Sequence, residues 1–324
     1  MTTAPSASAS LAERLDGLLF FPVTAFGPDG ALDLEVYRTH VRRGIEAGAG
    51  AVFACCGTGE FHALTPEEFH DCVTVAVEEA AAVEAAGGVR VPVVAGAGYG
   101  TALAVHYAKL AERAGADGLL AMPPYLVVAD QEGLVRHYTA LAGATELDVV
   151  VYQRDNAVFA PETVARLARV PGIIGLKDGL GDLDLMQRIV SAVREAGVEG
   201  FRYFNGLPTA ELTGLAYRGI GVTLYSSAVF CFVPEVALAF HRALLAGDDD
   251  VVNRLLDGFY RPLVELRNQG RGYAVSLVKA GVRMRGLDVG EVRSPLSEPS
   301  AAHVKELAEL IERGMELVGE GGAR

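Results

Sequence analysis

The stretch GIIGLKDGLGD, residues 172–182, begins like a buried strand and then reaches a lysine, which is followed at once by Asp178 and Gly179. Small and β-branched residues before the lysine are typical of a strand. Lysine is rarely fully buried, because burial removes water from its charge. A strand that ends on Lys177 therefore predicts either a lysine with a chemical role or a structural ion pair between Lys177 and Asp178.

Seven other short apolar runs resemble this one, and helical stretches separate them at intervals of roughly 20 to 40 residues, the size of one βα unit. The eight predicted strands cover residues 18–26, 51–55, 91–96, 118–122, 148–152, 172–177, 201–205 and 221–226. Their lack of polar alternation indicates parallel strands that are buried on both faces. Eight such units predict an α/β fold, a (β/α)8 barrel. A doubly wound open sheet, which usually has fewer strands, is the alternative.

The 324 residues, 51% of them hydrophobic, are enough for one large barrel. We expect a flexible N-terminal tail over residues 1–15, the barrel over 16–247 and a C-terminal helical appendage over 248–324. The first ten residues lack the basic and apolar regions of a secretory signal. No apolar run approaches the ~20 residues of a membrane span.

The formal net charge of −13 disfavours binding to nucleic acid and to anionic membranes. The cysteines show no CxxC spacing, which predicts free thiols in a reducing cytoplasm. His62 and His70 have no third ligand in view, so we expect no metal site. Residues 96–100, GAGYG, lack the spacing of a dinucleotide-binding turn, which disfavours an NAD-dependent dehydrogenase.

The catalytic end of such a barrel is the rim formed by the C-terminal ends of its strands. Burial there would lower the pKa of Lys177 and populate its free amine. A free amine attacks a ketone and forms a protonated Schiff base, which is an electron sink. The other lysines, Lys109, Lys279 and Lys305, lie in helical stretches, and we expect them to be solvated.

Tyr152 ends the preceding predicted strand, so its side chain should neighbour Lys177 and could relay protons. A core tyrosine is the alternative. The turn GTGE, residues 57–60, offers N–H groups and a hydroxyl to a carboxylate, or is simply a tight turn. In YSSA, residues 225–228, two hydroxyls could bind a substrate or cap a helix.

Across roughly residues 16–317, the chain resembles the dihydrodipicolinate synthase/N-acetylneuraminate lyase superfamily. The motifs that carry the resemblance are FPVTAF, GTGEF, MPPYL, VYQRDN, GLKDGLGD, YSSAVF and EVRSPL. The resemblance implies that Lys177 is the Schiff-base lysine and Tyr152 the proton-relay tyrosine. It also implies that Thr58 and Gly59 bind the carboxylate of a 2-keto acid.

Leu126 stands where the synthases have a second tyrosine, so the resemblance favours a dehydratase branch of the superfamily. Gln153 and Cys231 each replace an asparagine of that branch. The remaining candidate substrate contacts are Tyr125, Arg154, Ser226 and Ser227. Arg154 could form a bidentate pair with the distal carboxylate of a diacid, or an ordinary ion pair.

The implied substrate is a six-carbon keto-deoxy sugar diacid that loses water and CO2 without a metal or organic cofactor. The resemblance also implies a homo-oligomer, either a dimer or a tetramer. Two alternatives remain open from the residues: an aldolase or lyase acting on another 2-keto-3-deoxy sugar acid, and a non-catalytic sugar-acid sensor.

Overall fold

The computed structural model describes residues 10–321, and its centre is a closed barrel of eight parallel strands in sequential order. The first strand pairs with both the second and the eighth, which closes the barrel. The strands are β1 (Leu19–Phe20), β2 (Ala51–Ala54), β3 (Val93–Ala97), β4 (Gly118–Ala121), β5 (Asp148–Gln153), β6 (Ile173–Asp178), β7 (Arg202–Asn205) and β8 (Leu224–Ser227). The predicted (β/α)8 barrel is confirmed, and the open-sheet alternative is wrong.

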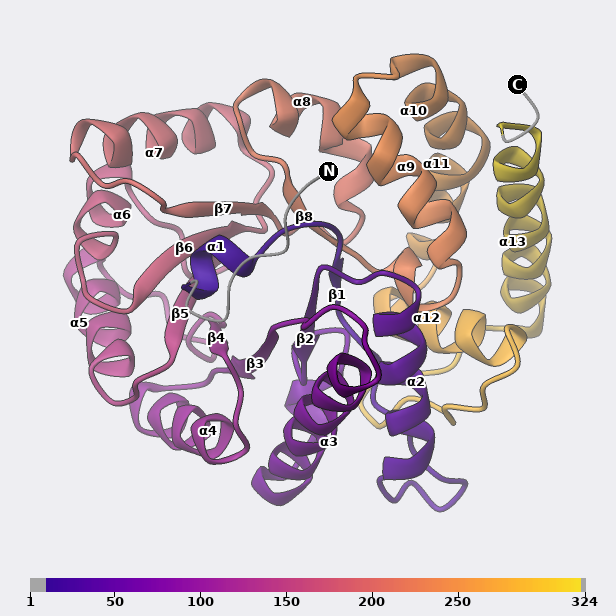
Figure 1. The fold of residues 1–324 in the computed structure, drawn as a ribbon, viewed down its shortest axis with the longest axis horizontal. Coiled ribbons are helices and arrows are strands. Elements are labelled where there is room, and N and C mark those ends of the chain that lie inside the picture. Colours follow the sequence, from indigo (N-terminus) through magenta and orange to yellow (C-terminus); the bar gives the residue numbers. More distant parts are fainter. Residues whose placement is uncertain (1–9, 322–324) are drawn as a thin grey trace.

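Eight α-helices form a ring outside the strands (Figure 1). They are α2 (Leu34–Glu46), α3 (Pro66–Ala85), α4 (Thr101–Arg113), α5 (Gln131–Ala142), α6 (Pro161–Leu167), α7 (Leu183–Glu195), α8 (Gly214–Gly219) and α9 (Pro234–Ala246). The helix α3 begins with a capping box, in which Thr65 and Glu68 each accept a hydrogen bond from the other's backbone N–H. This cap fixes where the chain leaves the turn after β2.

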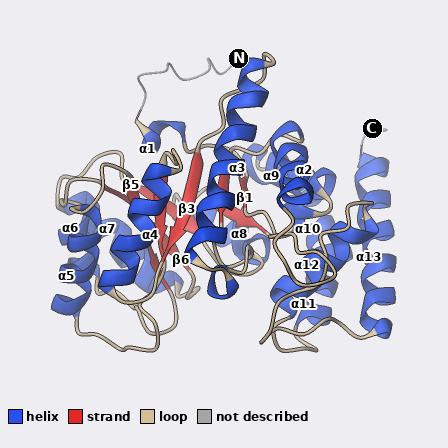
Figure 2. Ribbon diagram, turned by 90° about the horizontal axis from the view of Figure 1, so that it is seen from below, coloured by secondary structure: helices blue, strands red, loops and turns tan. Residues whose placement is uncertain are grey.

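The remaining helices gather on one side of the barrel (Figures 1 and 2). They are α10 (Asp249–Leu255), the π-helical turn η4 (Leu256–Tyr260), α11 (Arg261–Arg267), α12 (Tyr273–Met284) and α13 (Ala301–Gly321). Short 3-10 turns, η1 (Phe61–Ala63), η2 (Ala210–Thr213) and η3 (Val229–Cys231), follow β2, β7 and β8. The boundary expected after residue 247 falls between α9 and α10 and remains a prediction.

Residues 10–15 do not belong to a tail, contrary to expectation. They form α1 (Leu11–Arg14) and its flanks, which lie across one end of the barrel (Figure 1). Leu11 and Leu15 are buried with the barrel interior, and Arg14 forms a salt bridge of 2.8 Å with Asp117 just before β4. The helix therefore closes the N-terminal end of the barrel. Residues 1–9 of the predicted tail lie outside the described residues.

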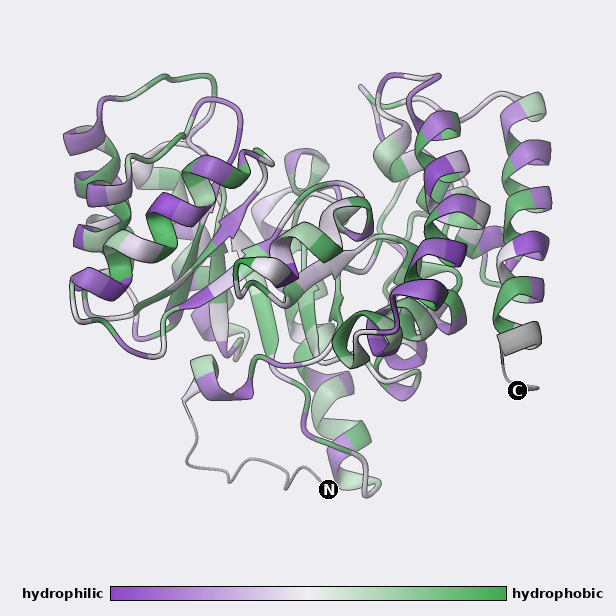
Figure 3. Ribbon diagram, turned by 90° about the horizontal axis from the view of Figure 1, so that it is seen from above, coloured by the Kyte–Doolittle hydropathy of each residue, from purple (hydrophilic) through white to green (hydrophobic). Residues whose placement is uncertain are grey.

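The apolar core has two layers, which explains why the strands lack polar alternation. On β5, Val149 and Val151 pack outward against the helices, whereas Val150 and Tyr152 point into the barrel. Figure 3 shows the resulting distribution, with apolar strands at the centre and polar turns on the outer helices. Period-two alternation thus directs Tyr152 inward at the C-terminal end of β5.

The cysteines are free and buried, as expected for Cys55, Cys56, Cys72 and Cys231. Burial raises the pKa of the Cys56 thiol to about 12, so this thiol is protonated at neutral pH. Among the described residues, no helix is both long enough and apolar enough to cross a membrane.

Candidate active site

A cavity of about 510 Å³ opens at the C-terminal ends of the strands. Six of the eight predicted site residues line it: Thr58, Tyr125, Tyr152, Arg154, Lys177 and Ser226. The segment before and along α12 contributes Gly272, Ala274 and Val275 to the opposite wall. The cavity therefore lies between the barrel rim and the C-terminal helices.

Lys177 and Tyr152 are direct neighbours in the register of β6 and β5. The Lys177 side chain is buried, and its Nζ lies 4.1 Å from the ring centroid of Phe21 and 4.6 Å from that of Tyr152. The pKa of Lys177 is lowered to about 8, mainly by burial and to a smaller extent by the positive charge of Arg154, while Cys56 opposes the shift. A substantial fraction of the amine is therefore neutral near physiological pH, when it can act as a nucleophile.

The alternative of an ion pair between Lys177 and Asp178 is wrong. The Asp178 carboxylate accepts hydrogen bonds from Gln153 Nε2 at 2.8 Å, from the backbone N–H of Leu180 at 3.0 Å and from the Tyr217 hydroxyl. None of these three partners of Asp178 lines the substrate cavity. Gln153, one of the two departures from the family pattern, therefore supports Asp178 and does not face the substrate cavity.

The Tyr152 hydroxyl lies between a carbonyl and a cation. It donates a hydrogen bond to the backbone oxygen of Gly206 at 3.2 Å, and Arg154 Nη1 lies 3.4 Å from the same hydroxyl. Burial raises the pKa of Tyr152, while Arg154 opposes this rise. Arg154 also pairs with Asp155 at 3.2 Å, and it remains partly exposed toward the cavity.

Two glycines make room for these side chains, and the sequence analysis did not identify either one. A Cβ on Gly206 would stand 2.5 Å from Lys177 Cγ, and a Cβ on Gly179 would stand 2.8 Å from Tyr152 Cε2. Both glycines directly follow a strand of the barrel. In the sequence, each glycine was visible only as the residue that follows a strand end. The structure shows why a side chain would not fit there, because Lys177 or Tyr152 passes directly over the glycine.

The turn after β2 presents Gly57 and Thr58 to the cavity, whereas Gly59 is buried behind them. The Thr24 hydroxyl donates to the Gly59 carbonyl at 2.7 Å and so anchors the turn from below. Within residues 10–321, the N–H groups of Thr58 and Gly59 donate to no protein acceptor. Such free N–H groups suit an anion.

The two serines of β8 separate, as successive residues on a strand do. Ser226 lines the cavity, but Ser227 is fully buried and donates to Glu211 Oε1 at 2.6 Å. The expectation that Ser227 contacts substrate is therefore wrong, because period-two alternation points it away from the barrel interior. Burial raises the pKa of Glu211 to about 7, and the Ser227 hydrogen bond opposes this shift.

The loop between β4 and α5 forms the outer wall of the cavity. Tyr125 lines it and is 64% exposed. Asn156 Nδ2, across the rim, donates to the carbonyls of Pro124 at 2.7 Å and Val127 at 2.6 Å. Sequence reasoning missed Asn156, which ties the Tyr125 loop to the residues after β5.

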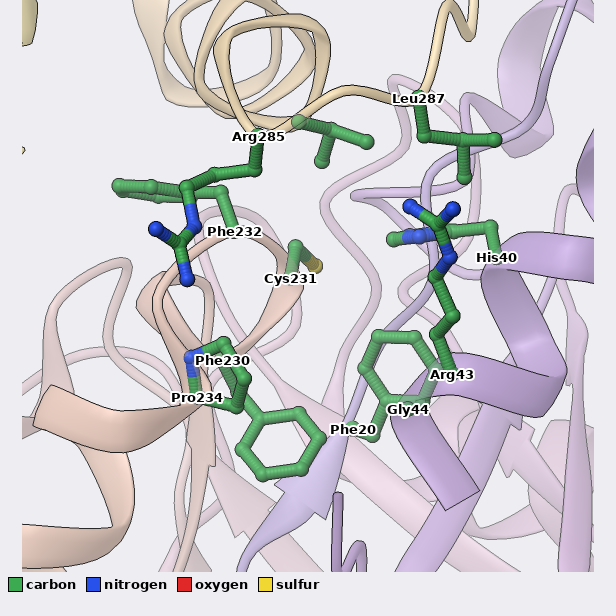
Figure 4. Close-up of a pocket in the computed structure, with 11 residues that line it drawn as sticks. Phe20, His40, Arg43, Gly44, Phe230, Cys231, Phe232, Pro234, Arg285 and Leu287 are labelled. Atoms are coloured by element: carbon green, nitrogen blue, oxygen red, sulfur yellow. The ribbon is translucent and has the colours of Figure 1, made fainter. Parts of the chain in front are cut away.

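Cys231, the second departure from the family pattern, lies outside the substrate cavity. Its thiol donates to the Phe21 carbonyl at 3.1 Å. It lines a separate cavity of about 180 Å³ between α2, η3 and the end of α12, whose walls carry Arg43 and Arg285 (Figure 4). Neither departure therefore alters the surface that would contact substrate.

The expectation of solvated lysines holds for Lys109 and Lys305, which are exposed, but it is wrong for Lys279. Lys279 is fully buried, and its Nζ lies 3.1 Å from Glu60 Oε1. Because Glu60 is the last residue of GTGE, this pair connects the candidate carboxylate-binding turn to α12.

Residues 14–313 match the Dihydrodipicolinate synthetase family, and the chain belongs to this family. The solved structure of dihydrodipicolinate synthase from Bacillus clausii has a similar fold, with a TM-score of 0.83 and 26% identity. That similarity covers 93% of this chain and 98% of the synthase. The family accounts for both the closed barrel and the C-terminal helices.

Closer relatives bear a different name. "Probable 5-dehydro-4-deoxyglucarate dehydratase 1" of Streptomyces avermitilis is 74% identical and covers 97% of this chain and 99% of its own length. A "probable 5-dehydro-4-deoxyglucarate dehydratase" of Streptomyces griseus is 73% identical over 98% of both chains. A protein of the same name from Bradyrhizobium diazoefficiens is 45% identical over 92% of this chain and 91% of its own.

Proposed function

We propose that this chain converts 5-dehydro-4-deoxyglucarate to 2,5-dioxopentanoate, CO2 and water through a Schiff base on Lys177. The observation that carries the proposal is the Lys177 amine, which is buried without a carboxylate partner at the wall of a 510 Å³ cavity and beside Tyr152. The names of the relatives specify the substrate.

The cavity supplies cations and donors for a dianion, although the whole chain carries a charge of −13. The turn at Thr58 and Gly59 would bind the carboxylate beside the ketone, which places the ketone carbon near Lys177. Arg154 would hold the distal carboxylate, and Ser226 and Tyr125 would contact the hydroxyls. A fixed guanidinium favours carboxylates because it offers two parallel N–H donors.

In the first stage, the neutral amine of Lys177 adds to the ketone, and loss of water gives a protonated Schiff base. The cation acidifies the neighbouring methylene, whose proton passes to Tyr152 or to a substrate carboxylate. The resulting enamine expels the β-hydroxyl, which takes up a proton and leaves as water. A conjugated iminium remains on Lys177.

In the second stage, the bond between the distal carboxylate and its neighbouring carbon breaks, and its electron pair flows into the conjugated iminium. CO2 leaves, and the dienamine takes up a proton on carbon. Its remaining enol becomes an aldehyde. Hydrolysis of the Schiff base consumes one water, releases 2,5-dioxopentanoate and restores Lys177, so the net products are one CO2 and one water.

Borohydride trapping tests the proposal directly. We expect reduction in the presence of substrate to add mass at Lys177, and substrate turnover to release CO2 and 2,5-dioxopentanoate. The variant Lys109→Met, at an exposed helical lysine, is the control and should trap normally. Release of pyruvate in place of CO2 would indicate the aldolase alternative, and the absence of turnover would indicate a sensor. Labelling at another lysine would contradict the assignment.

We further propose that the chain is a cytoplasmic homo-oligomer. Four consecutive side chains at the rim, residues 125–128, are apolar or aromatic and exposed, from 57% to 84%. An exposed apolar patch favours contact with another protein surface. Size-exclusion chromatography with light scattering should give a multiple of the 34.1 kDa chain mass, and a monomer would contradict the oligomer.

A further inference from the structure

In the described part of the chain, the one salt bridge in which neither side chain has any exposed surface lies behind the substrate cavity and not in it. Glu60 and Lys279 have no exposed side-chain surface, and Glu60 Oε1 lies 3.1 Å from Lys279 Nζ. Neither residue lines the cavity. A buried ion pair contributes little net stability, because its attraction must offset the desolvation of both groups. Its presence therefore calls for another explanation.

Both ends of this pair are bound to the same C-terminal segment. Lys279 also donates to the Glu291 carbonyl at 2.7 Å, and the backbone N–H of Arg293 donates to Glu60 Oε2 at 2.9 Å. The ammonium lies 4.3 Å from the ring centroid of Phe26. Each carboxylate oxygen of Glu60 thus has a donor from the C-terminal region, so the side chain has one well-defined position.

Arg293 extends this connection to the start of α3. Its guanidinium contacts both carboxylate oxygens of Glu68, at 2.6 and 2.7 Å, and donates to the Ala63 carbonyl at 2.9 Å. Glu68 belongs to the capping box of α3. The segment around Arg293 is therefore attached to the turn after β2 at its last residue and at the helix that follows.

The backbone of the turn needs such support. Cys55 and Glu60 both have positive φ angles, 51° and 55°, in the left-handed region that disfavours residues other than glycine. These conformations persist only where the surroundings over-determine them, and they cluster at functional sites. Between these two residues lie Thr58 and Gly59, whose N–H groups donate to no acceptor within residues 10–321.

We propose that Glu60 and Lys279 are positioning residues, which hold the Thr58–Gly59 turn in the geometry that receives the substrate carboxylate. The inference rests on the proposed function for the identity of that carboxylate. The proposal gives α12 a part in substrate recognition, because its Lys279 contacts Glu60, which lies 219 residues earlier in the sequence. Glu60 fixes the turn, and Lys279 cancels a buried negative charge that would repel an incoming anion.

Three variants separate positioning from simple structural support: Lys279→Met, Glu60→Gln and the two combined. The single changes should raise the KM about tenfold, which corresponds to about 1.4 kcal/mol, and change kcat less. The double variant removes both charges, so its melting temperature should recover toward that of the wild type. Its KM should stay raised, because the turn remains without its anchor.

Lys305→Met is the matched control, since this side chain lies in the second turn of α13 and is 80% exposed. It should leave KM, kcat and melting temperature unchanged. A double variant in which KM recovers together with the melting temperature would overturn the inference, because the pair would then be only structural. An unchanged KM in folded Glu60→Gln would overturn it as well.

Borohydride trapping distinguishes this inference from the proposed function. The concentration of substrate, or of pyruvate as a minimal 2-keto acid probe, that gives half-maximal trapping at Lys177 should rise in the variants, with the same limiting yield. No trapping in the wild type would overturn the proposed function and the inference together. If the wild type is trapped normally and the variants need the same concentration for half-maximal trapping, the positioning role alone would be overturned.

Discussion

Lys177 and Lys279 are both buried, and they differ in what surrounds the ammonium group. Lys177 Nζ faces the rings of Phe21 and Tyr152, and the ionisable groups that act on it are Cys56 and Arg154. Lys279 Nζ has a carboxylate at 3.1 Å. Burial lowers the pKa of both lysines, but Glu60 opposes this shift at Lys279.

Burial alone therefore does not produce a nucleophile. At Lys279, the Glu60 carboxylate opposes the lowering of the pKa, and the ammonium donates hydrogen bonds to Glu60 and to the Glu291 carbonyl, so this lysine links two parts of the chain. Aromatic neighbours and a nearby guanidinium leave Lys177 without such a partner, at the edge of a cavity. The difference in local charge supports the opposite roles that we propose for these two lysines.

The largest expected effect is that of Lys177→Met. Removing the amine should lower the turnover rate by about 10⁴-fold or more, because both bond cleavages depend on its Schiff base. The same change should increase the free energy of unfolding by about 1 to 3 kcal/mol, since it removes an unpaired buried amine. CO2 release and urea unfolding measure the two effects. A variant that is inactive and also destabilised would contradict the account of Lys177 as an unpaired group.

Lys279→Met should have the opposite effect on stability. It leaves the Glu60 carboxylate buried without its cation, which typically costs about 3 to 5 kcal/mol in the free energy of unfolding. Urea unfolding beside Lys177→Met gives the direct contrast between the two lysines. A loss below about 1 kcal/mol would mean that the Glu60 carboxylate finds another partner when Lys279 is absent.

Gly206→Ala tests how closely Lys177 must be placed. The added methyl group would stand 2.5 Å from Lys177 Cγ and 2.6 Å from its Cε, so the lysine must move. We expect kcat/KM to fall about 10²-fold, the cost typical of a 1 Å misplacement. Gly219→Ala, where no atom lies within 4 Å of the added carbon, is the control. Unchanged kinetics in Gly206→Ala would mean that the Lys177 side chain has other productive positions.

The smallest expected effect concerns pH. The rate of Schiff-base formation should rise as pH increases through about 8, because the neutral amine of Lys177 is the reactive form and its pKa is about 8. The positive charge of Arg154 disfavours protonation of Lys177, so Arg154→Gln should raise this pKa and move the midpoint upward by a fraction of a pH unit. Trapping rates at several pH values measure the midpoint. A downward shift would contradict the proximity of the two cations.

Local sequence patterns were sufficient to predict the barrel and the position of Lys177 on its rim. Eight apolar runs without polar alternation indicated parallel strands, and a lysine at the end of one of them fell on the rim. Strand spacing also placed Tyr152 beside Lys177, as the register of β5 and β6 confirms. The strands and the pairing of Tyr152 with Lys177 involve residues within one or two consecutive βα units, so a local sequence pattern is enough to predict them.

The sequence analysis was wrong where a residue's role depends on its direction or on a distant partner. Ser226 and Ser227 are adjacent and chemically identical, and the register of β8 directs only Ser226 into the cavity. The residues after Ser10 form a short helix that contacts the barrel, although we expected them to belong to a flexible tail. A composition pattern contains no information on which surface will cover a segment.

The amino-acid sequence by itself determined the barrel, the rim and the lysine that ends β6, because strand periodicity and chain direction follow from local backbone geometry. Only the tertiary structure decided which buried lysine is free to react. That outcome depends on whether a carboxylate lies within a few ångströms of each ammonium, and Glu60 reaches Lys279 only after 219 residues of chain have folded back onto the rim.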